Sequence, residues 1–185
     1  AGKVATIGNG VDSTYFSPAP ESASPFASGE RPIVFTGAMD YWPNVDAVSW
    51  FARDMLPQIR ARDRSARFYV VGMNPASAVR ALASDPGVVV TGRVDDVRPF
   101  LEHARVIVAP LRVARGIQNK LLEAMAMGRA CVVTPETAAG LEPAALPAVR
   151  VGRGEQDFAA ATVALLENPA AAAALATKAR RTVEA

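Results

Sequence analysis

Short apolar runs alternate along the chain with longer segments in which apolar residues recur every three or four positions. The short runs are rich in Val and Ile, which predicts β-strands. We expect strands at residues 32–37, 67–72, 88–90, 105–110, 130–134 and 147–151. These runs are continuously apolar, without polar alternation, which is typical of a parallel sheet covered by helices on both faces.

The segments between these strands carry helical signals. Pro43 occupies a favoured position at a helix start. Val48, Phe51, Met55 and Ile59 follow it at spacings of three or four, so one face of this helix should be buried. Other helices are expected at residues 75–83, after a cap at Asp95 and Asp96, at residues 117–127, and in the alanine-rich tail.

The strand-helix-strand repetition predicts an α/β fold, a Rossmann-like doubly wound parallel sheet of about six strands. Residues 1–30 are predicted to be an interdomain linker or lead-in, because residues 17–30 are rich in Ser, Pro and Ala. Residues 31–168 would form the Rossmann-like domain, and residues 169–185 a C-terminal helix. Ligands of such sheets bind at the carboxyl ends of the strands. The loops to search therefore follow Gly37, Gly92, Pro110 and Thr134.

Composition narrows the class of protein. The chain's 185 residues suffice for one well-buried domain, and a formal charge of +2 gives no reason to expect a nucleic-acid partner. The lone Cys131 excludes an internal disulfide and fits a reducing, cytoplasmic compartment. No apolar run approaches the roughly 20 residues that cross a bilayer, and no secretion signal opens the sequence. No clustered His, Cys or carboxylate set predicts a metal site, and no cofactor is expected.

The most informative segment spans residues 115–128. Gly116 permits close backbone approach just before the predicted helix. The amides of a first helical turn, together with the positive end of the helix dipole, form a site for anions. Arg112 and Arg115 add positive charge beside it.

On a helical wheel, Asn119, Lys120 and Glu123 share a narrow polar strip. Glu123 lies about 10 Å along the axis from Gly116, at a rise of roughly 1.5 Å per residue. That separation suits a carboxylate that binds the hydroxyls of a sugar ring while phosphates lie at the helix start. The same spacing also suits an intrahelical ion pair between Lys120 and Glu123, worth a few tenths of a kcal/mol. Spacing alone leaves both interpretations open.

Residues 123–133 resemble the helix-and-strand signature of retaining glycosyltransferases of the GT-B fold, family four. Residues 8–12, followed by residues 15–18, resemble the segment that enters the C-terminal lobe of these enzymes. Residues 91–96 resemble their loop at the nucleobase. Three motifs thus occur in the family's order across most of the chain.

More narrowly, residues 37–47 and 115–123 resemble sugar transferases associated with bacterial exopolysaccharide loci of the PEP-CTERM type. The resemblance implies the nucleotide-sugar-binding C-terminal half of a two-lobed enzyme, which moves a sugar from a nucleoside-diphosphate sugar to an acceptor with retention. An N-terminal lobe outside this sequence would bind the acceptor and could contact the inner membrane peripherally. This half alone is expected to be inactive, and no catalytic residue is assigned.

The resemblance also implies roles for individual residues. Glu123 would hold the ribose of the nucleotide. Lys120 and the backbone amides near Gly116 and Ile117 would face the diphosphate or the donor sugar. The residues that would bracket the base are Gly92, Arg93 and Val94. The remaining members of the predicted donor site are Gly37, Asn119, Arg112 and Arg115.

Two departures from the family pattern matter. The family has two glutamates separated by seven residues, but Arg115 occupies the first position here. An Arg and Lys pair after the first strand is also missing, with Met39 and Asn44 in that neighbourhood. Neutralisation of the diphosphate must then depend on Arg112, Arg115, Lys120 or a group from the other lobe.

Other candidate residues have structural interpretations. His103 suits the negative end of a short helix, and Cys131 is predicted to be a small core residue. Tyr41 and Trp42 could stack on a sugar or pack over the helix start at Pro43, and both interpretations stay open.

Two other function classes compete with glycosyl transfer. A nucleotide-sugar epimerase can use a similar fold, but it would need additional acid–base carboxylates and histidines in the cleft. A non-catalytic doubly wound module of the receiver type would gather acidic residues after the first strand, where Asp40 stands alone. The fold by itself cannot separate these classes.

Overall fold

The computed structural model describes residues 10–19 and 22–185 of the chain. In this part of the chain, six strands form one all-parallel sheet in the order β3-β2-β1-β4-β5-β6. The strands are β1 (Arg31–Thr36), β2 (Ala66–Val71), β3 (Val88–Gly92), β4 (Val106–Ala109), β5 (Cys131–Val133) and β6 (Arg150–Val151). The order reverses between β1 and β4, as in Rossmann-like doubly wound sheets. The predicted fold class is confirmed.

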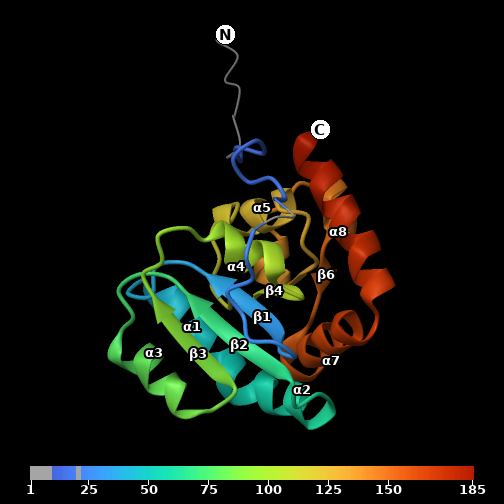
Figure 1. Cartoon of the computed structure of the whole chain (residues 1–185). Helices are drawn as coiled ribbons and strands as arrows, with labels where there is room; N and C mark the ends of the chain where they lie inside the picture. Colours follow the sequence, from blue (N-terminus) through green and yellow to red (C-terminus); the bar gives the residue numbers. More distant parts are fainter. Residues whose placement is uncertain (1–9, 20–21) are drawn as a thin grey trace.

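Helices cover both faces of the sheet (Figure 1). One face packs against α1 (Trp42–Trp50), η1 (Phe51–Met55), α2 (Leu56–Arg62), α3 (Ser77–Ala81), η2 (Leu82–Ser84) and α7 (Gly154–Glu167). The other packs against α4 (Arg98–His103), α5 (Asn119–Ala126) and α8 (Pro169–Glu184). Two short turns, α6 (Pro135–Ala138) and η3 (Pro143–Ala148), follow β5.

Successive residues of the central strand β1 enter the two cores in turn. Phe35 lies in the core that contains Phe51 and Phe68, whose ring centroids are 4.4 Å apart. Val34 lies in the other core, with Leu121 of α5. Because a strand points alternate side chains to opposite faces, a continuous apolar run fills both layers.

The first long helical run, from α1 through η1 to α2, buries the apolar face that the sequence predicts. Val48, Phe51, Met55 and Ile59 are all fully buried. At the end of η1 the Leu56 amide bonds to the Phe51 carbonyl five residues earlier, and Pro57 follows. Proline cannot donate a backbone hydrogen bond, and a local π register is one way to accommodate it.

Three predicted boundaries are wrong, one of them the start of α5, which lies at Asn119 instead of residue 117. The predicted strand at residues 147–151 shrinks to Arg150–Val151, because Pro147 lies inside the 3-10 turn η3. The helix predicted at residues 75–83 starts only at Ser77, because Asn74 takes a left-handed φ of 54° and redirects the chain.

The described part of the lead-in is tied to the second face of the sheet. The Phe26 ring lies 4.6 Å from that of Tyr69, centroid to centroid. His103 Nε2 donates to the Ser22 carbonyl at 2.8 Å, so this histidine holds the lead-in against α4. The motif residues Gly8 and Asn9 lie outside the described residues, and the division of the chain at residues 30 and 168 stays a prediction.

The alanine-rich helix α8 packs along α5 and η3, with Ala179 fully buried. Among the described residues, no single helix has the length and apolar character to cross a membrane. Taken together α7 and α8 would meet those criteria, but they are bent by 103° at their junction.

Gly72→Ala is expected to lower the free energy of unfolding by about 3 kcal/mol. A Cβ at Gly72 would lie 1.7 Å from the Gly37 carbonyl oxygen, so the ends of β1 and β2 would have to separate. Urea denaturation measures the loss. The control is Gly29→Ala, which has a φ of +83° but no atom within 4 Å of a new Cβ, and should cost only about 1 kcal/mol. Equal losses in the two variants would contradict the proposed clash.

Candidate functional site

A pocket of about 590 Å³ opens at the carboxyl ends of β1 and β2, beside the start of α5. It lies where the strand order reverses, between β1 and β4, which is the usual ligand position in such sheets. Its lining residues are Thr36, Gly37, Ala38, Tyr41, Asn44, Val71, Gly72, Met73, Arg93, Val94, Val97, Ile117, Gln118, Asn119, Lys120 and Glu123.

The absent side chain of Gly37 makes room for the polar groups of this pocket. A Cβ there would lie 2.8 Å from Asn44 Nδ2 and 3.0 Å from Lys120 Nζ. The glycine that ends the first strand therefore lets two side chains from distant helices meet over the backbone.

Lys120 and Asn44 form the central contact of the pocket. Lys120 Nζ donates to Asn44 Oδ1 at 2.5 Å and lies 4.4 Å from the centroid of the Phe35 ring. Asn44 is itself buried, and its Nδ2 donates to the Ala38 carbonyl at 2.8 Å. One ammonium is thus fixed by groups from β1, the loop after it, and α1.

Burial changes the acidity of both charged groups in the pocket. Desolvation lowers the pKa of Lys120 from 10.5 to about 8, although Glu123 opposes the shift. Desolvation raises the pKa of Glu123, and Lys120 opposes that shift. Among the described residues, no ion pair within 4.0 Å joins the two, so the intrahelical pair that the spacing left open is not formed. Lys120 turns to Asn44 instead.

Helix α5 begins two residues later than predicted, at Asn119. Gly116 has a φ of +65°, and Gln118 is extended at φ −95° and ψ 110°, so neither is helical. The first-turn amides therefore belong to residues from 119 onward. Ile117 lines the pocket, whereas Gly116 does not.

The loop after β3 reaches the pocket with two of its three predicted residues, since Gly92 is not among the lining residues. Arg93 and Val94 line it, and Gly92 just before them turns the chain with a φ of +68°. The backbone of Arg93 and Val94 therefore lines the same pocket as the start of α5.

The two predicted cations of the loop after β4 do not line the pocket. Arg112 makes a two-pronged ion pair with Asp46 on α1, and its guanidinium lies 5.0 Å from the centroid of the Trp50 ring. Arg115 is exposed. Of the basic residues that the sequence offered for a diphosphate, only Lys120 lines this pocket.

Two lining residues, Asn44 and Tyr41, have roles that the sequence alone did not show. Asn44 looked like a departure from the family pattern, but it holds Lys120. Tyr41 and Trp42 are about 60% exposed, so they do not pack over the helix start, and Tyr41 lines the pocket. Pro43 near the helix start was the available signal, since it places Asn44 in the first turn of α1.

The other candidates take structural positions. Cys131 is fully buried, which raises the pKa of its thiol to about 12 and confirms it as a core residue. Asp96 Oδ1 accepts from the Arg98 amide at 2.9 Å at the start of α4. Within residues 10–19 and 22–185, no three His, Cys, Asp or Glu side chains come together as a metal site would require.

Comparison with protein families gives one match, to the family described as "Glycosyl transferases group 1", over residues 30–168. No curated protein matched the chain.

Solved structures share the fold. Sucrose-phosphate synthase from Thermosynechococcus elongatus matches at a TM-score of 0.75 and 19% identity, over 100% of this chain and 48% of its own. The C-terminal domain of a glycosyl transferase group 1 family protein (LpcC) from Francisella tularensis matches at a TM-score of 0.70 and 16% identity. The match covers 95% of this chain and 97% of that domain's chain. Anabaena Alr3699/HepE, solved in complex with UDP and glucose, matches at a TM-score of 0.67 and 12% identity. The match covers 95% of this chain and 50% of the Alr3699/HepE chain. The chain spans 34–51% of the length of the first three structures matched.

Lys120→Met is expected to raise the free energy of unfolding by about 1–2 kcal/mol at pH 7. The folded protein would no longer bury an ammonium, although Asn44 Oδ1 would lose a hydrogen bond. The gain should shrink as the pH rises from about 8 toward 10.5, because folded Lys120 is then neutral while the unfolded chain still binds the proton. Urea denaturation of the wild type and the variant across this pH range measures the difference in their free energies of unfolding.

Lys178→Met, at an exposed position of α8, is the matched control and should change stability little. A gain that is independent of pH, or a net loss at pH 7, would show that burial of the Lys120 charge has no measurable cost.

Proposed function

The chain belongs to the family of glycosyl transferases group 1, and on that premise we propose that its pocket binds the nucleoside diphosphate of a nucleotide-sugar donor. The sugar is transferred to an acceptor with retention of anomeric configuration, in line with the resemblance to family four. One observation supports this most: Lys120 and Glu123 enter the same pocket from one helix whose start also lines it.

The diphosphate is placed at Lys120 and the first turn of α5. First-turn amides and the positive dipole end attract phosphate oxygens, and the ammonium adds a full charge. Because Arg112 is bound to Asp46 and Arg115 is exposed, Lys120 takes the neutralising role in this lobe. Stabilising the departing diphosphate is what allows the anomeric carbon to ionise.

The ribose and then the base continue from the diphosphate, because the ribose joins the two. Glu123 lies one helical turn beyond Lys120, and its carboxylate can accept from two ribose hydroxyls. Arg93 and Val94 face the base from the loop after β3, partly through backbone groups. The complex of Alr3699/HepE with UDP and glucose supports this ligand class.

The competing function classes find less support in the pocket. Glu123 is the only carboxylate among its described lining residues, and those include no histidine, whereas an epimerase would need several acid–base groups. Asp40 accepts from Asn74 and does not line the pocket, which gives no support to a receiver-type cluster.

The proposal extends to the whole enzyme. A second lobe would bind the acceptor, and the chain described here would have no turnover without it. The setting is bacterial exopolysaccharide synthesis in the cytoplasm, with peripheral contact at the inner membrane through the other lobe. The resemblance of residues 37–47 and 115–123 supports this assignment.

Glu123→Ala should weaken UDP or GDP binding by about 10-fold or more, because a carboxylate that accepts two hydrogen bonds contributes about 1.5–3 kcal/mol. Isothermal titration with both nucleotides measures the effect. Arg112→Ala is the control and should change the affinity less than about twofold, since its guanidinium is bound to Asp46 outside the pocket. No heat with any nucleoside diphosphate at millimolar concentration would refute the assignment.

Nucleotide affinity should fall several-fold between about pH 7 and pH 9. Lys120, whose pKa is about 8, loses its positive charge over this range, while the phosphates stay fully ionised. Lys120→Arg keeps a charged group at every pH in the range and should flatten the profile. An unchanged profile in this variant would mean that Lys120 does not contact the diphosphate.

A further inference from the structure

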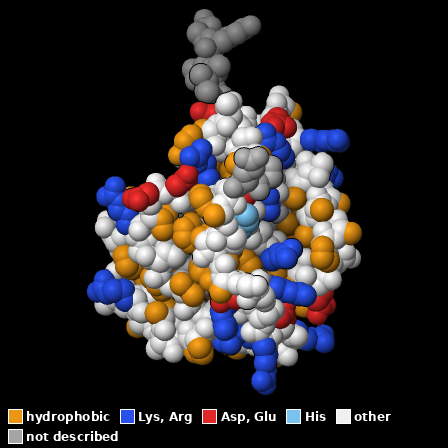
Figure 2. Space-filling view, viewed as in Figure 1, with side chains coloured by type: hydrophobic (Ala, Val, Ile, Leu, Met, Phe, Trp, Pro, Cys, Tyr) orange, Lys and Arg blue, Asp and Glu red, His pale blue; other side chains and the backbone are white. Residues whose placement is uncertain are grey.

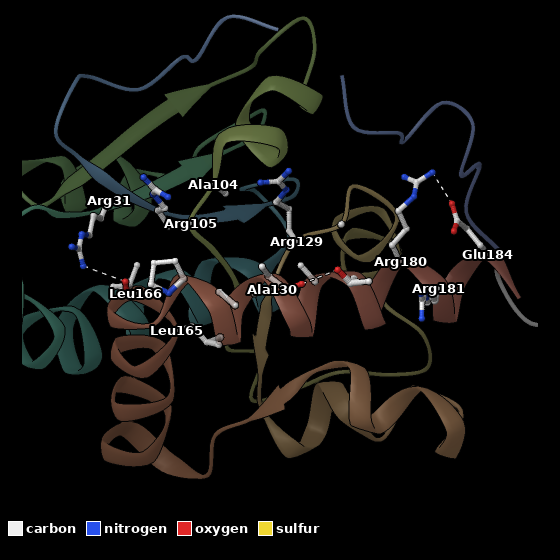
Figure 3. A pocket seen from close by; sticks show the side chains of 16 residues that line it. Arg31, Ala104, Arg105, Arg129, Ala130, Leu165, Leu166, Arg180, Arg181 and Glu184 are labelled. Carbon is white, nitrogen blue, oxygen red and sulfur yellow. Dashed lines mark hydrogen bonds and ion pairs between the residues drawn. The ribbon is translucent and has the colours of Figure 1, made fainter. Parts of the chain in front are cut away.

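A second groove, of about 640 Å³, lies at the opposite edge of the sheet from the pocket (Figure 3). Its walls are α8 on one side and the amino-terminal ends of β1, β4 and β5 on the other. These three strands are neighbours in the sheet. The groove shares no lining residue with the pocket proposed to bind the nucleotide.

An arginine stands at the beginning of each of these three strands. Arg31 is the first residue of β1, Arg105 directly precedes β4, and Arg129 lies two residues before β5. Since neighbouring strands are about 4.8 Å apart, their guanidinium groups form a row. Figure 3 shows this row along α8, continued by Arg180, and Figure 2 shows Lys and Arg side chains gathered on this side of the molecule.

Helix ends hold several of these arginines in place without using all their donors. Arg31 donates to the Leu166 carbonyl of α7 at 3.2 Å, and Arg129 Nε donates to the Met127 carbonyl beyond α5 at 3.1 Å. Arg180 likewise donates to the end of α5. A guanidinium has five N–H donors, so such contacts orient the group and leave others for a ligand.

Three arginines of the groove are ion-paired: Arg31 with Asp63 at 3.2 Å, Arg129 with Glu102 at 3.3 Å, and Arg180 with Glu184. Five arginines are among its described lining residues, Arg181 being the fifth, and the one carboxylate there is Glu184. Glu184 already pairs with Arg180 at 2.6 Å. Arg105 is exposed, and its side chain has no partner in the described part of the chain. An anion at this edge would therefore be stabilised chiefly by the unpaired charge of Arg105, together with the remaining donors of the row.

Toward its end α8 contributes the polar Thr177, Arg180, Arg181 and Glu184, but the part of the opposite wall near the start of α8 is apolar. It is formed by small residues of α8, Ala172, Ala173 and Ala176, with Leu165 and Leu166 at the end of α7. Inorganic phosphate would use only the arginine side of such a groove. A molecule with a phosphate at one end and hydrocarbon beside it would use both walls.

We propose that this groove binds a phosphate group carried on a hydrocarbon chain, as in an anionic lipid. The phosphate oxygens accept hydrogen bonds from Arg105 and Arg129, and the hydrocarbon lies along the alanine face of α8. The site is separate from the nucleotide pocket and goes beyond the proposed function. It would give this lobe its own contact with lipid.

Decyl phosphate, below its micelle concentration, is the probe, and isothermal titration with the 185-residue chain is the measurement. It should bind at least 10-fold more tightly than inorganic phosphate or the neutral decyl glucoside. Arg105→Glu should weaken the binding by 10-fold or more without affecting folding, because this side chain has no partner to lose. Arg64→Glu, in an exposed turn before β2, is the matched control and should bind like the wild type.

Two further experiments distinguish the source of the lipid and separate this proposal from the nucleotide proposal. Flotation with phosphatidylglycerol vesicles, against phosphatidylcholine vesicles, shows whether the lipid is taken from a bilayer or as a single molecule. Glu123→Ala should leave decyl phosphate binding unchanged, so failure of the nucleotide proposal and failure of this one are distinguishable. Equal binding of decyl phosphate and decyl glucoside, equal binding of inorganic phosphate, or no effect of Arg105→Glu would each overturn the proposal.

Discussion

The contact between the Lys120 ammonium and Asn44 is the constraint on which the rest of the pocket depends. It joins the fifth helix to the first across the reversal of strand order, and it lies over a glycine that leaves the necessary space. Because Asn44 is also bonded to the Ala38 carbonyl, the cation has a defined position before any ligand arrives. A charge fixed in advance needs no reorganisation when an anion binds.

This contact also accounts for one departure from the family pattern. The resemblance to family four implies a basic pair in the loop after β1, and this sequence has an asparagine in that neighbourhood instead. Lys120 brings an ammonium to the same place from the α5 side, with its pKa lowered by burial. A positive charge therefore lies at the end of the first strand, and α5 supplies it.

Much of the fold could be predicted because its signals are local. Continuous apolar runs predicted strands covered on both faces, and Phe35 and Val34 show why, since each enters a different core. The start of α5 could not be predicted, because the left-handed turn at Gly116 and the extended Gln118 have no distinctive local pattern. The partners of the two basic side chains could not be predicted either. Arg112 binds Asp46, 66 residues away in the sequence, and Lys120 binds Asn44, 76 residues away. Those partners are brought together only by the packing of α1 against the sheet.

The glycines at the ends of β1 and β2 have a consequence for how this pocket can diversify. A Cβ at Gly72 would lie 1.7 Å from the Gly37 carbonyl oxygen, so position 72 does not accommodate even a methyl group, whereas a Cβ at Gly37 would meet the side chains of Asn44 and Lys120. At Gly72 the cavity is therefore lined by main chain, which offers the same surface whatever the surrounding sequence. The side chains that can change the shape of the pocket on this side then lie in the flanking segments near residues 93–94 and 117–118.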